Sequence, residues 1–372
     1  MKQHQRRIGI MGAGKIGGAI AKMLASSGDY QVTVLDINET ALQPLSQIPH
    51  VATRHLTSAD TRALSTVLKP LDAVLSACAF DLNVPIAEAA LEAGVSYFDL
   101  TEDVATTAAI RQLAEQAGPG QIFMPQCGLA PGFVGILAAD MARRFDTLEA
   151  INMRVGALPL YPDNRLKYNL TWSTEGLVNE YCNPCEAIEQ GKPVRLQPLE
   201  GLEHLMVDGV EYEAFNTSGG LGTLCESLGD RVTELNYKTL RYPGHRDLML
   251  FLTRDLGLGQ PGRRALMKTL LEESVPFTAQ DIVVICVTVT GMQQGQFVKV
   301  TETRKVHNGE WRGEHWTAIQ MATASGVCAV VDLFFEGELP EKGFVKQEQV
   351  DLALFLGNRF GFQFNHAQRC AN

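Results

Sequence analysis

Short apolar runs alternate with helix-like stretches along the first 125 residues. The strand-like runs are 8–11, 32–36, 73–76, 95–99 and 122–125. Between them, apolar residues recur three or four positions apart, which is the spacing of one helix face. These helical stretches are 16–26, 84–93 and 105–117. Strands that alternate with helices favour a parallel sheet with right-handed crossovers, so we predict an α/β domain over residues 1–126.

The pattern changes after residue 127. Longer, partly alternating runs predict strands at 151–158, 166–171, 234–240, 281–290 and 296–305. Asn308-Gly309 lies between two such runs and predicts a hairpin turn. Helical spacing is clearest at 132–144 and 263–273. We predict an α+β domain over 127–316 with a mainly antiparallel sheet, followed by a C-terminal segment, 317–372, with helical stretches at 317–334 and 346–355.

The composition is that of a folded protein rather than a disordered one. Of the 372 residues, 45 % are hydrophobic and 20 % are charged, which gives enough apolar surface for a large core. The net charge is −10, and no run of basic residues occurs. These features exclude a nucleic-acid-binding protein and argue against binding to an anionic membrane surface.

The sequence carries no sign of export. Residues 1–7 are polar and lack the apolar core of a signal peptide. No apolar stretch approaches the length of a transmembrane helix, so none is expected. Eight cysteines are scattered along the chain, and in this context free thiols are favoured over disulfides. We expect a cytoplasmic protein.

A glycine-rich motif follows the first strand and opens the first helix. Gly12, Gly14 and Gly17 have the spacing that lets the chain turn tightly, approach a pyrophosphate and pack helix on strand. The amino end of the helix offers N–H groups to the phosphates. The motif therefore predicts a dinucleotide site, and a glycine-rich turn without a ligand is the alternative.

An acidic residue at the end of the second strand indicates which dinucleotide binds. Asp36 lies 24 positions after Gly12, where it can accept hydrogen bonds from ribose hydroxyls and repel a 2′-phosphate. NAD is therefore expected as the cofactor, with NADP less favoured. A turn-capping aspartate is the alternative. The residues assigned to the cofactor are Gly12, Gly14, Lys15, Ile16, Gly17, Asp36, Ile37, Ala77 and Cys78.

Five further stretches, in order along the chain, resemble segments of one protein family. They are 96–100 (SYFDL), 127–132 (CGLAPG), 156–159 (GALP), 171–173 (TWS) and 237–245 (YKTLRYPGH). Together they resemble the saccharopine dehydrogenase family, and in particular its lysine 6-dehydrogenase-like and saccharopine reductase-like members. The resemblance implies a Rossmann domain, a substrate domain, and a C-terminal segment that packs back on the first domain. It also implies hydride transfer between a nicotinamide and the C–N bond of an amino-acid substrate.

The resemblance places Asp99 and Cys127 beside the substrate and the nicotinamide, and Arg241 in the wall that faces the substrate. Asp99 ends a strand, where ligands bind in open α/β sheets, and can hold an ammonium or act as a general base. Arg241 offers a planar fork that suits an α-carboxylate. The alternatives are a loop-fixing carboxylate for Asp99 and a structural salt bridge for Arg241.

Other candidates have weaker grounds. Cys127 could line the nicotinamide pocket or be a small buried residue. His245 follows Pro243-Gly244 and could relay protons near neutral pH, or it could be structural. Trp172 and Ser173 could shape the substrate pocket, with a plain core tryptophan as the alternative.

Two positions depart from the family pattern. Ala130 stands where the family loop often carries aspartate, and Thr217 aligns where saccharopine-handling members tend to carry an arginine. Because a second substrate carboxylate needs a second cation, Thr217 in the substrate site favours a smaller substrate such as lysine.

No metal site is expected. The eight histidines show neither HxxxH nor HxH spacing, and the CxxC at Cys182 and Cys185 lacks the second pair that zinc would need.

The apolar run 281–290 lacks charged residues that would protect a sheet edge, so we expect the second domain's sheet to mediate a homodimer.

Three hypotheses about function remain open at this point. The first is an NAD-dependent oxidoreductase acting on the C–N bond of a lysine-like or saccharopine-like amino acid. The second is reductive condensation of an aldehyde with a diamine, as in carboxynorspermidine-forming relatives; Asp36 argues against it, because such reductions usually draw on NADPH. The third is a non-catalytic dinucleotide-binding protein, against which the joint presence of Asp99, Cys127 and Arg241 argues.

Overall fold

The computed structural model describes residues 5–57, 60–365 and 367–371. The chain forms two compact units. The first contains Met1–Phe133 and Thr323–Gln363, and the second contains Val134–Ala322 and Phe364–Asn372. The sequence prediction divides the chain at residues 126 and 316; in these two units, most of the segment 317–372 belongs to the first unit and its two ends belong to the second.

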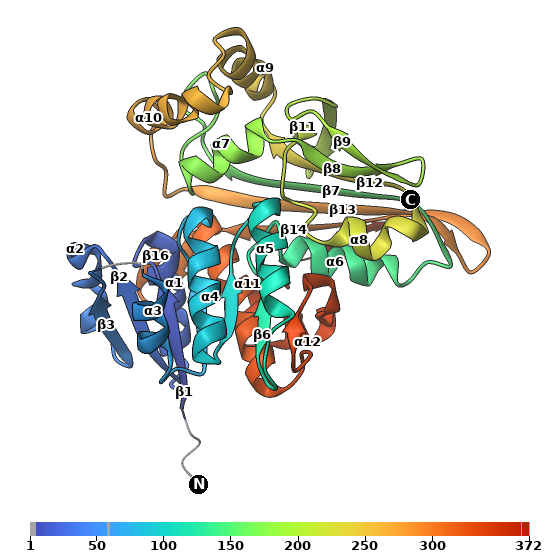
Figure 1. Ribbon diagram of the computed structural model, residues 1–372. Coiled ribbons are helices and arrows are strands. Elements are labelled where there is room, and N and C mark those ends of the chain that lie inside the picture. Colours follow the sequence, from blue (N-terminus) through green and yellow to red (C-terminus); the bar gives the residue numbers. More distant parts are fainter. Residues whose placement is uncertain (1–4, 58–59, 366, 372) are drawn as a thin grey trace. The chain divides into compact units, whose positions relative to one another are not determined.

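The first unit is built on a parallel sheet of seven strands, in the order β17-β6-β5-β4-β1-β2-β3 (Figure 1). The strands are β1 (Arg6–Met11), β2 (Tyr30–Asp36), β3 (Val51–His55), β4 (Ala73–Ser76), β5 (Ser96–Asp99), β6 (Ile122–Met124) and β17 (Gly343–Phe344). Five of these strands and the parallel pairing confirm the sequence prediction. The strand β3 was missed because only two of its five residues, Val51 and Ala52, are apolar.

Helices connect the strands of this unit. They are α1 (Lys15–Ala25), α2 (Glu39–Leu42), α3 (Thr61–Leu68), α4 (Asn83–Ala93), α5 (Val104–Ala114) and α12 (Leu352–Gly357). In α1, Ile20, Met23 and Leu24 are buried on one face, as the spacing of the apolar residues predicts. The helix α4 ends at Gly94, which adopts the left-handed conformation that glycine favours there. The expected helix at 346–355 is divided into a short 3₁₀ turn, Gln347–Gln349, and α12.

The second unit is built on a mixed, mainly antiparallel sheet of nine strands. The main path runs β10-β11-β12-β7-β13-β14-β18, and β8 and β9 join it at β12. The strands are β7 (Thr147–Pro159), β8 (Cys185–Glu189), β9 (Lys192–Leu196), β10 (Glu203–Val207), β11 (Val210–Asn216), β12 (Val232–Arg241), β13 (Asp281–Gln293), β14 (Gln296–His307) and β18 (Ala367–Ala371). Only β7 and β12 pair in parallel, so the predicted sheet type is confirmed.

The helices of this unit are α6 (Phe133–Ala142), α7 (Thr174–Cys182), α8 (Leu224–Leu228), α9 (His245–Leu250) and α10 (Arg264–Ser274). One apolar cluster holds α7, α9 and α10 together, and its members include Tyr181, Met249 and Met267. The cluster also contains Tyr168. It therefore fixes the segment before α7 against the start of α9.

Three sequence predictions are corrected in this unit. The run 166–171 is not a strand: only Leu170 makes a bridge, to Phe277, and the side chains of Tyr168 and Thr171 are buried among those of their neighbours. Asn308-Gly309 is not a hairpin turn, because the strand after it, β15 (Gly309–Trp311), pairs with β16 (Glu314–Trp316). The strand at 281–290 is not a sheet edge, because β13 pairs with β7 and with β14.

One helix, α11 (Ala318–Glu336), is long and apolar enough to cross a membrane by length and composition alone. Most of it is buried inside the protein, and it carries Ser325 and Asp332 as buried polar side chains. These are features of a core helix.

Seven cysteines have described side chains, and all seven are free thiols. The side chain of Cys370 and residues 1–4 lie outside the described part.

Candidate functional site

The loop between β1 and α1 has a backbone that requires glycine. Gly12 has a φ of 101°, and a Cβ there would lie 3.0 Å from the carbonyl oxygen of Ala77. A Cβ at Gly17 would lie 1.9 Å from the carbonyl oxygen of Gly12. By contrast, a Cβ at Gly14 would meet nothing within 4 Å. The loop is therefore closely packed at Gly12 and Gly17. It is open at Gly14, at the amino end of α1, where a phosphate can approach.

Asp36 holds this loop in place. Its Oδ2 accepts a hydrogen bond from the N–H of Ala13 at 2.5 Å, and its Oδ1 accepts one from the N–H of Asn38 at 2.7 Å. Each carboxylate oxygen has a second lone pair, so ribose hydroxyls can still be bound. Ile37 beside it is 72 % exposed, which leaves an apolar surface next to the carboxylate.

The remaining cofactor candidates surround the same loop. The N–H of Ala77 donates to the carbonyl of Met11 at 2.8 Å, and Cys78 lies beside Gly12. Burial raises the pKa of the Cys78 thiol to about 11, so it stays neutral. Lys15 and Ile16 form the first turn of α1. These residues fit a bound dinucleotide: glycines at the turn, backbone amides for the phosphates and a carboxylate for the ribose.

Asp99 ends β5 and is completely buried. Its Oδ1 accepts hydrogen bonds from the N–H groups of Thr101 at 3.0 Å and Gln126 at 2.9 Å. Its Oδ2 accepts one from the hydroxyl of Tyr97 at 2.9 Å. Burial raises the pKa of the Asp99 carboxyl to about 6, against the opposing effect of these three hydrogen bonds. The carboxylate both holds the loop after β6 and titrates near neutral pH.

Cys127 is tied to Asp99 through the backbone and to the C-terminal segment through its thiol. Its N–H donates to the carbonyl of Asp99 at 2.8 Å. The side-chain amide of Gln347 donates to the Cys127 sulfur at 3.2 Å and to the carbonyl of Pro125 at 2.9 Å. Burial raises the pKa of the thiol well above its usual range, so Cys127 is a neutral wall of this site rather than a nucleophile.

In the second unit, Arg241 begins a chain of hydrogen bonds with a fixed direction. Its Nε donates to the hydroxyl of Tyr181 at 2.9 Å, and the same hydroxyl contacts Nε2 of His245 at 3.0 Å. Nδ1 of His245 lies 2.9 Å from the carbonyl of Leu166, which can only accept. His245 therefore carries its proton on Nδ1, and the Tyr181 hydroxyl donates to Nε2.

The same contacts keep His245 neutral. Burial, and then the charge of Arg241, lower the pKa of His245 to about 3. Both ring nitrogens are engaged, so the imidazole does not titrate near neutral pH and acts as a fixed acceptor. Arg241 is itself buried, and its guanidinium lies 4.9 Å from the ring centroid of Tyr168. Its Nη1 donates to its neighbour Leu240, and Nη2 makes no hydrogen bond to any residue that the structure describes.

Three further candidates lie in the second unit. Trp172 donates from Nε1 to the hydroxyl of Tyr168 at 3.1 Å, so it is linked to the Arg241 group through one ring. Ser173 caps α7, with its Oγ accepting the N–H of Gly176 at 3.1 Å. The hydroxyls of Thr217 and Thr239 lie 2.8 Å apart, both buried. Trp172 and Arg241 thus both contact Tyr168, whereas Ser173 and Thr217 have other structural partners.

The sequence singled out Asp99, Cys127, Arg241 and His245 but missed the residues that hold them. Tyr97, Tyr181 and Gln347 were not identified, and neither was Tyr168. Tyr97 is two positions from Asp99 on the same face of β5, so strand periodicity could have identified it. Tyr181 and Gln347 reach their partners across 64 and 220 positions, for which the chain carries no local signal.

Comparison with known proteins shows the family and the fold of the chain. Residues 8–124 match the family model of the saccharopine dehydrogenase NADP binding domain, and residues 128–357 match that of the saccharopine dehydrogenase C-terminal domain. The apo structure of saccharopine dehydrogenase (L-Glu forming) from Saccharomyces cerevisiae superposes with a TM-score of 0.80. It is 14 % identical, over 99 % of this chain and 100 % of that one, and thus shows the same fold.

Weaker similarity connects part of the chain to much longer proteins. The mitochondrial alpha-aminoadipic semialdehyde synthases of Mus musculus and Rattus norvegicus are 24 % and 23 % identical to it over 200 residues. The match covers 52 % of this chain but only 21 % of each of those proteins, so the chain corresponds to a small part of them. With both family models matched along its length, the chain belongs to the saccharopine dehydrogenase family of oxidoreductases.

Proposed function

We propose that the protein is an NAD-dependent dehydrogenase that acts on the C–N bond of an amino acid, lysine or a saccharopine-like compound. The observation that carries the proposal is the Arg241 guanidinium. It is buried and oriented by Tyr181, and its Nη2 has no hydrogen bond to the described residues. A buried cation with an unused donor suits the carboxylate of an amino acid.

In such a reaction, Arg241, Asp99 and Cys127 would each have a different role. NAD, held by the glycine loop and Asp36, would supply the acceptor for the hydride that leaves the substrate carbon next to the nitrogen. Arg241 binds and orients the substrate carboxylate. Asp99, with a pKa of about 6, is ionised at neutral pH and takes the proton that the amine loses. The Cys127 thiol stays neutral, so it adds no negative charge beside the Asp99 carboxylate. Water then adds to the substrate imine and releases the nitrogen.

Thr217 favours lysine over saccharopine as the substrate. Its hydroxyl pairs with Thr239, and it adds no positive charge for a second carboxylate. The test is incubation of the protein with NAD and a panel of L-lysine, saccharopine, other amino acids and simple diamines, followed by nicotinamide absorbance. Reduction of NAD with an amino acid supports the proposal. No turnover of any amine, or turnover only of NADPH with an aldehyde and a diamine, contradicts it.

NAD is expected to bind more tightly than NADP. The charge of Asp36, at the end of β2, is expected to repel a 2′-phosphate, and repulsion in a partly desolvated site is worth on the order of 1–3 kcal/mol, about ten- to a hundredfold in affinity. Fluorescence titration with both dinucleotides measures the ratio. Asp36→Ala should reduce the ratio of NAD affinity to NADP affinity. The control Asp60→Ala removes a helix-capping aspartate in the same unit and should leave this ratio unchanged. Tighter binding of NADP to the unaltered protein contradicts the expectation.

A homodimer through the second sheet is also expected. Register places Asn152, Thr288, Thr301 and Asn236 in one row across four neighbouring strands, and all four residues are partly exposed. Such an uncharged row offers hydrogen bonds to a two-fold related copy. Sedimentation velocity over a range of concentrations should show a dimer that Thr288→Arg dissociates. A monomer at all concentrations refutes this expectation.

A further inference from the structure

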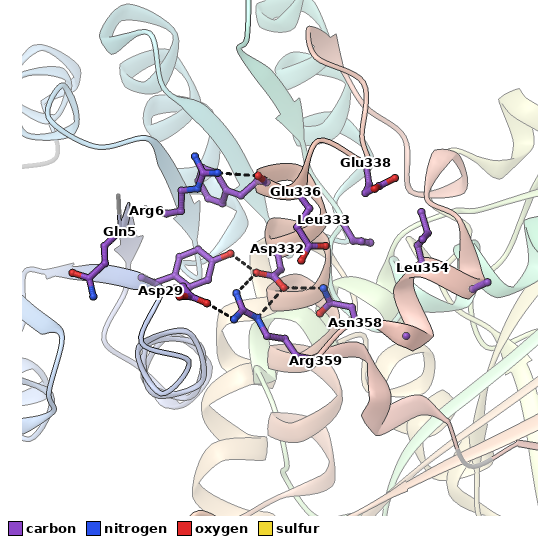
Figure 2. Close-up of a pocket in the computed structure, with 14 residues that line it drawn as sticks. Gln5, Arg6, Asp29, Asp332, Leu333, Glu336, Glu338, Leu354, Asn358 and Arg359 are labelled. Atoms are coloured by element: carbon purple, nitrogen blue, oxygen red, sulfur yellow. Dashed lines mark hydrogen bonds and ion pairs between the residues drawn. The ribbon is translucent and has the colours of Figure 1, made fainter. Parts of the chain in front are cut away.

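A cavity of about 720 Å³ lies at the edge of the parallel sheet where the strands begin (Figure 2). Its lining includes Arg6, the first residue of β1, and Tyr30, the first residue of β2. The glycine loop and Asp36 follow the opposite ends of these two strands. The cavity is therefore separate from the dinucleotide site, and its volume is that of a small-molecule pocket.

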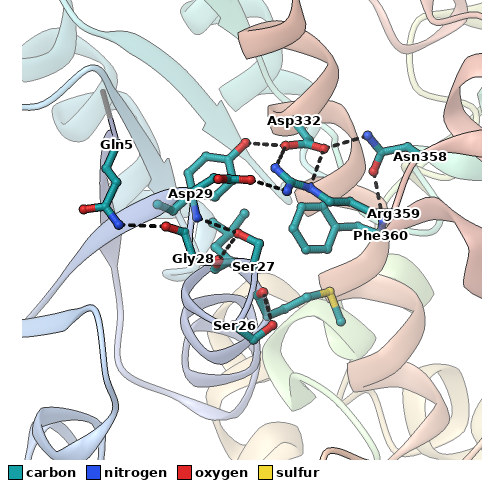
Figure 3. Close-up of polar contacts among 12 residues, drawn as sticks. Gln5, Ser26, Ser27, Gly28, Asp29, Asp332, Asn358, Arg359 and Phe360 are labelled. Carbon is teal, nitrogen blue, oxygen red and sulfur yellow. Dashed lines mark hydrogen bonds and ion pairs between the residues drawn. The ribbon is translucent and has the colours of Figure 1, made fainter. Parts of the chain in front are cut away.

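A buried carboxylate fixes one wall of the cavity (Figure 3). Asp332 of α11 accepts hydrogen bonds from the Tyr30 hydroxyl at 2.6 Å, from Nδ2 of Asn358 at 2.8 Å, and from Nε and Nη2 of Arg359 at 3.0 and 2.6 Å. Arg359 also forms an ion pair with Asp29. Because the single cation Arg359 faces two carboxylates, the network builds the wall and retains an excess of negative charge.

Charges without such partners lie elsewhere in the lining. Glu336 and Glu338, at the end of α11 and just after it, are exposed and make no ion pair with any residue that the structure describes. Figure 2 shows the Glu338 carboxylate without a polar contact to the other residues drawn. Partial burial raises the pKa of Glu336, and the charges of Asp332 and Glu338 add to this effect while that of Arg359 opposes it.

One cation in the lining is also available. The Arg6 guanidinium donates from Nη2 to the carbonyl of Phe335 at 3.1 Å and lies 5.1 Å from the centre of that ring. It forms no salt bridge with a carboxylate of the described residues, although its charge, like that of Arg7, helps to lower the pKa of Asp72. Since a guanidinium carries five N–H donors, several remain for a carboxylate from outside.

The rest of the lining is apolar or carries partial charge. Leu333, Phe335 and Leu354 supply hydrocarbon surface, and Leu354 is 43 % exposed. The carboxyl ends of α11 and α12 both lie at the cavity, with Glu336 and Gly357 in its lining. Helix carboxyl ends carry partial negative charge and favour a cation. The lining thus combines one available cation, an apolar surface and an excess of negative charge.

We propose that this cavity is a second ligand site and that it binds a basic amino acid. The carboxylate of the ligand lies on Arg6, and its terminal ammonium lies between Glu336 and Glu338. The methylene chain packs against Leu333 and Leu354. The inference rests on this unit alone and holds whether or not the proposed dehydrogenase activity is found.

Equilibrium dialysis of the full chain with radiolabelled L-lysine, in the absence of dinucleotide, tests the site. The double variant Glu336→Gln/Glu338→Gln should weaken binding about tenfold, the sum of two exposed ion pairs. The matched control is Glu88→Gln/Glu92→Gln, which removes two charges from exposed positions of α4 and should bind L-lysine as the unaltered chain does. L-norleucine, which lacks the terminal ammonium, should bind more weakly than L-lysine.

Two further variants decide where the ligand binds. Arg6→Gln should weaken L-lysine but not 1,5-diaminopentane, which has no carboxylate. Arg241→Ala should leave the cavity site intact, because Arg241 belongs to the other unit. Binding that Arg241→Ala abolishes and the glutamate variants preserve overturns the proposal, as does the absence of L-lysine binding up to about 10 mM. Activity of the unaltered chain with NAD is a separate readout of the proposed function.

Discussion

Asp99→Asn is expected to lower kcat by about 10²–10⁴, the usual reach of general acid–base catalysis. The asparagine cannot take a proton from the amine, although its oxygen can still accept from the N–H groups of Thr101 and Gln126. Steady-state kinetics with saturating NAD and the best amine of the substrate panel measure the loss. Dinucleotide affinity should stay nearly unchanged, because Asp99 lies outside the loop that Asp36 holds.

The pH profile provides an independent check of the same residue. Burial raises the pKa of Asp99 to about 6, and the reaction needs the ionised form. The value of kcat/KM should therefore rise with pH and level off above about pH 6. In Asp99→Asn this acidic limb should disappear. His245 contributes no second limb near neutral pH, since its pKa is lowered to about 3.

A matched control separates catalysis from stability. Asp103→Asn makes the same change four positions away, at the cap of α5, where the aspartate accepts the N–H of Thr106 at 2.7 Å. It should cost at most about 1 kcal/mol of stability and leave kcat unchanged. If Asp99→Asn keeps nearly full kcat, Asp99 only holds the loop after β6, and its role as proton acceptor is refuted.

The cofactor loop could be predicted from the sequence because its determinants are local. Gly12, Gly14 and Gly17 lie within six positions, and the positive φ of Gly12 and the close approach of Gly17 to Gly12 arise within the turn itself; the contact of Gly12 with Ala77, after β4, is a long-range constraint. Asp36 could likewise be predicted as a site residue. Its hydrogen bond to Ala13, however, shows that it also holds the loop, which spacing alone did not reveal.

The residues that hold the substrate candidates could not be predicted in the same way. The Tyr181 hydroxyl joins Arg241 to His245 across 60 and 64 positions, and this contact depends on how α7 packs against β12 and α9. The same packing explains why the apolar run 166–171 is not a strand. Tyr168 fills the cluster beside Arg241, so tertiary burial rather than sheet pairing accounts for its apolar character.

The packing around His245 also reverses a chemical expectation. A histidine on a turn is expected to titrate near neutral pH, but the exposure of position 245 is not visible in the sequence. In the structure the imidazole is buried between Tyr181 and the carbonyl of Leu166, beside the positive charge of Arg241. Burial of this kind turns a possible proton relay into a neutral support for the guanidinium.

Arg241→Ala is expected to raise KM about ten- to a hundredfold, because a hydrogen bond between charged groups contributes about 1.5–3 kcal/mol. Binding of the carboxylate is the same in the ground state and the transition state, so kcat should change little. The increase should be larger for amino acids than for diamines, which have no carboxylate. Arg195→Ala, which removes a guanidinium from an exposed position of β9, should leave KM unchanged.

Tyr181→Phe tests whether the orientation of this guanidinium matters as well as its charge. The variant keeps Arg241 but removes the Tyr181 hydroxyl. This hydroxyl accepts a hydrogen bond from Nε of Arg241 and is hydrogen-bonded to Nε2 of His245. KM for amino acids should rise by less than in Arg241→Ala, and the pH profile should keep its limb near pH 6 because Asp99 is untouched. Equal KM increases for amino acids and diamines in Arg241→Ala would show that Arg241 supports the fold and does not bind the carboxylate.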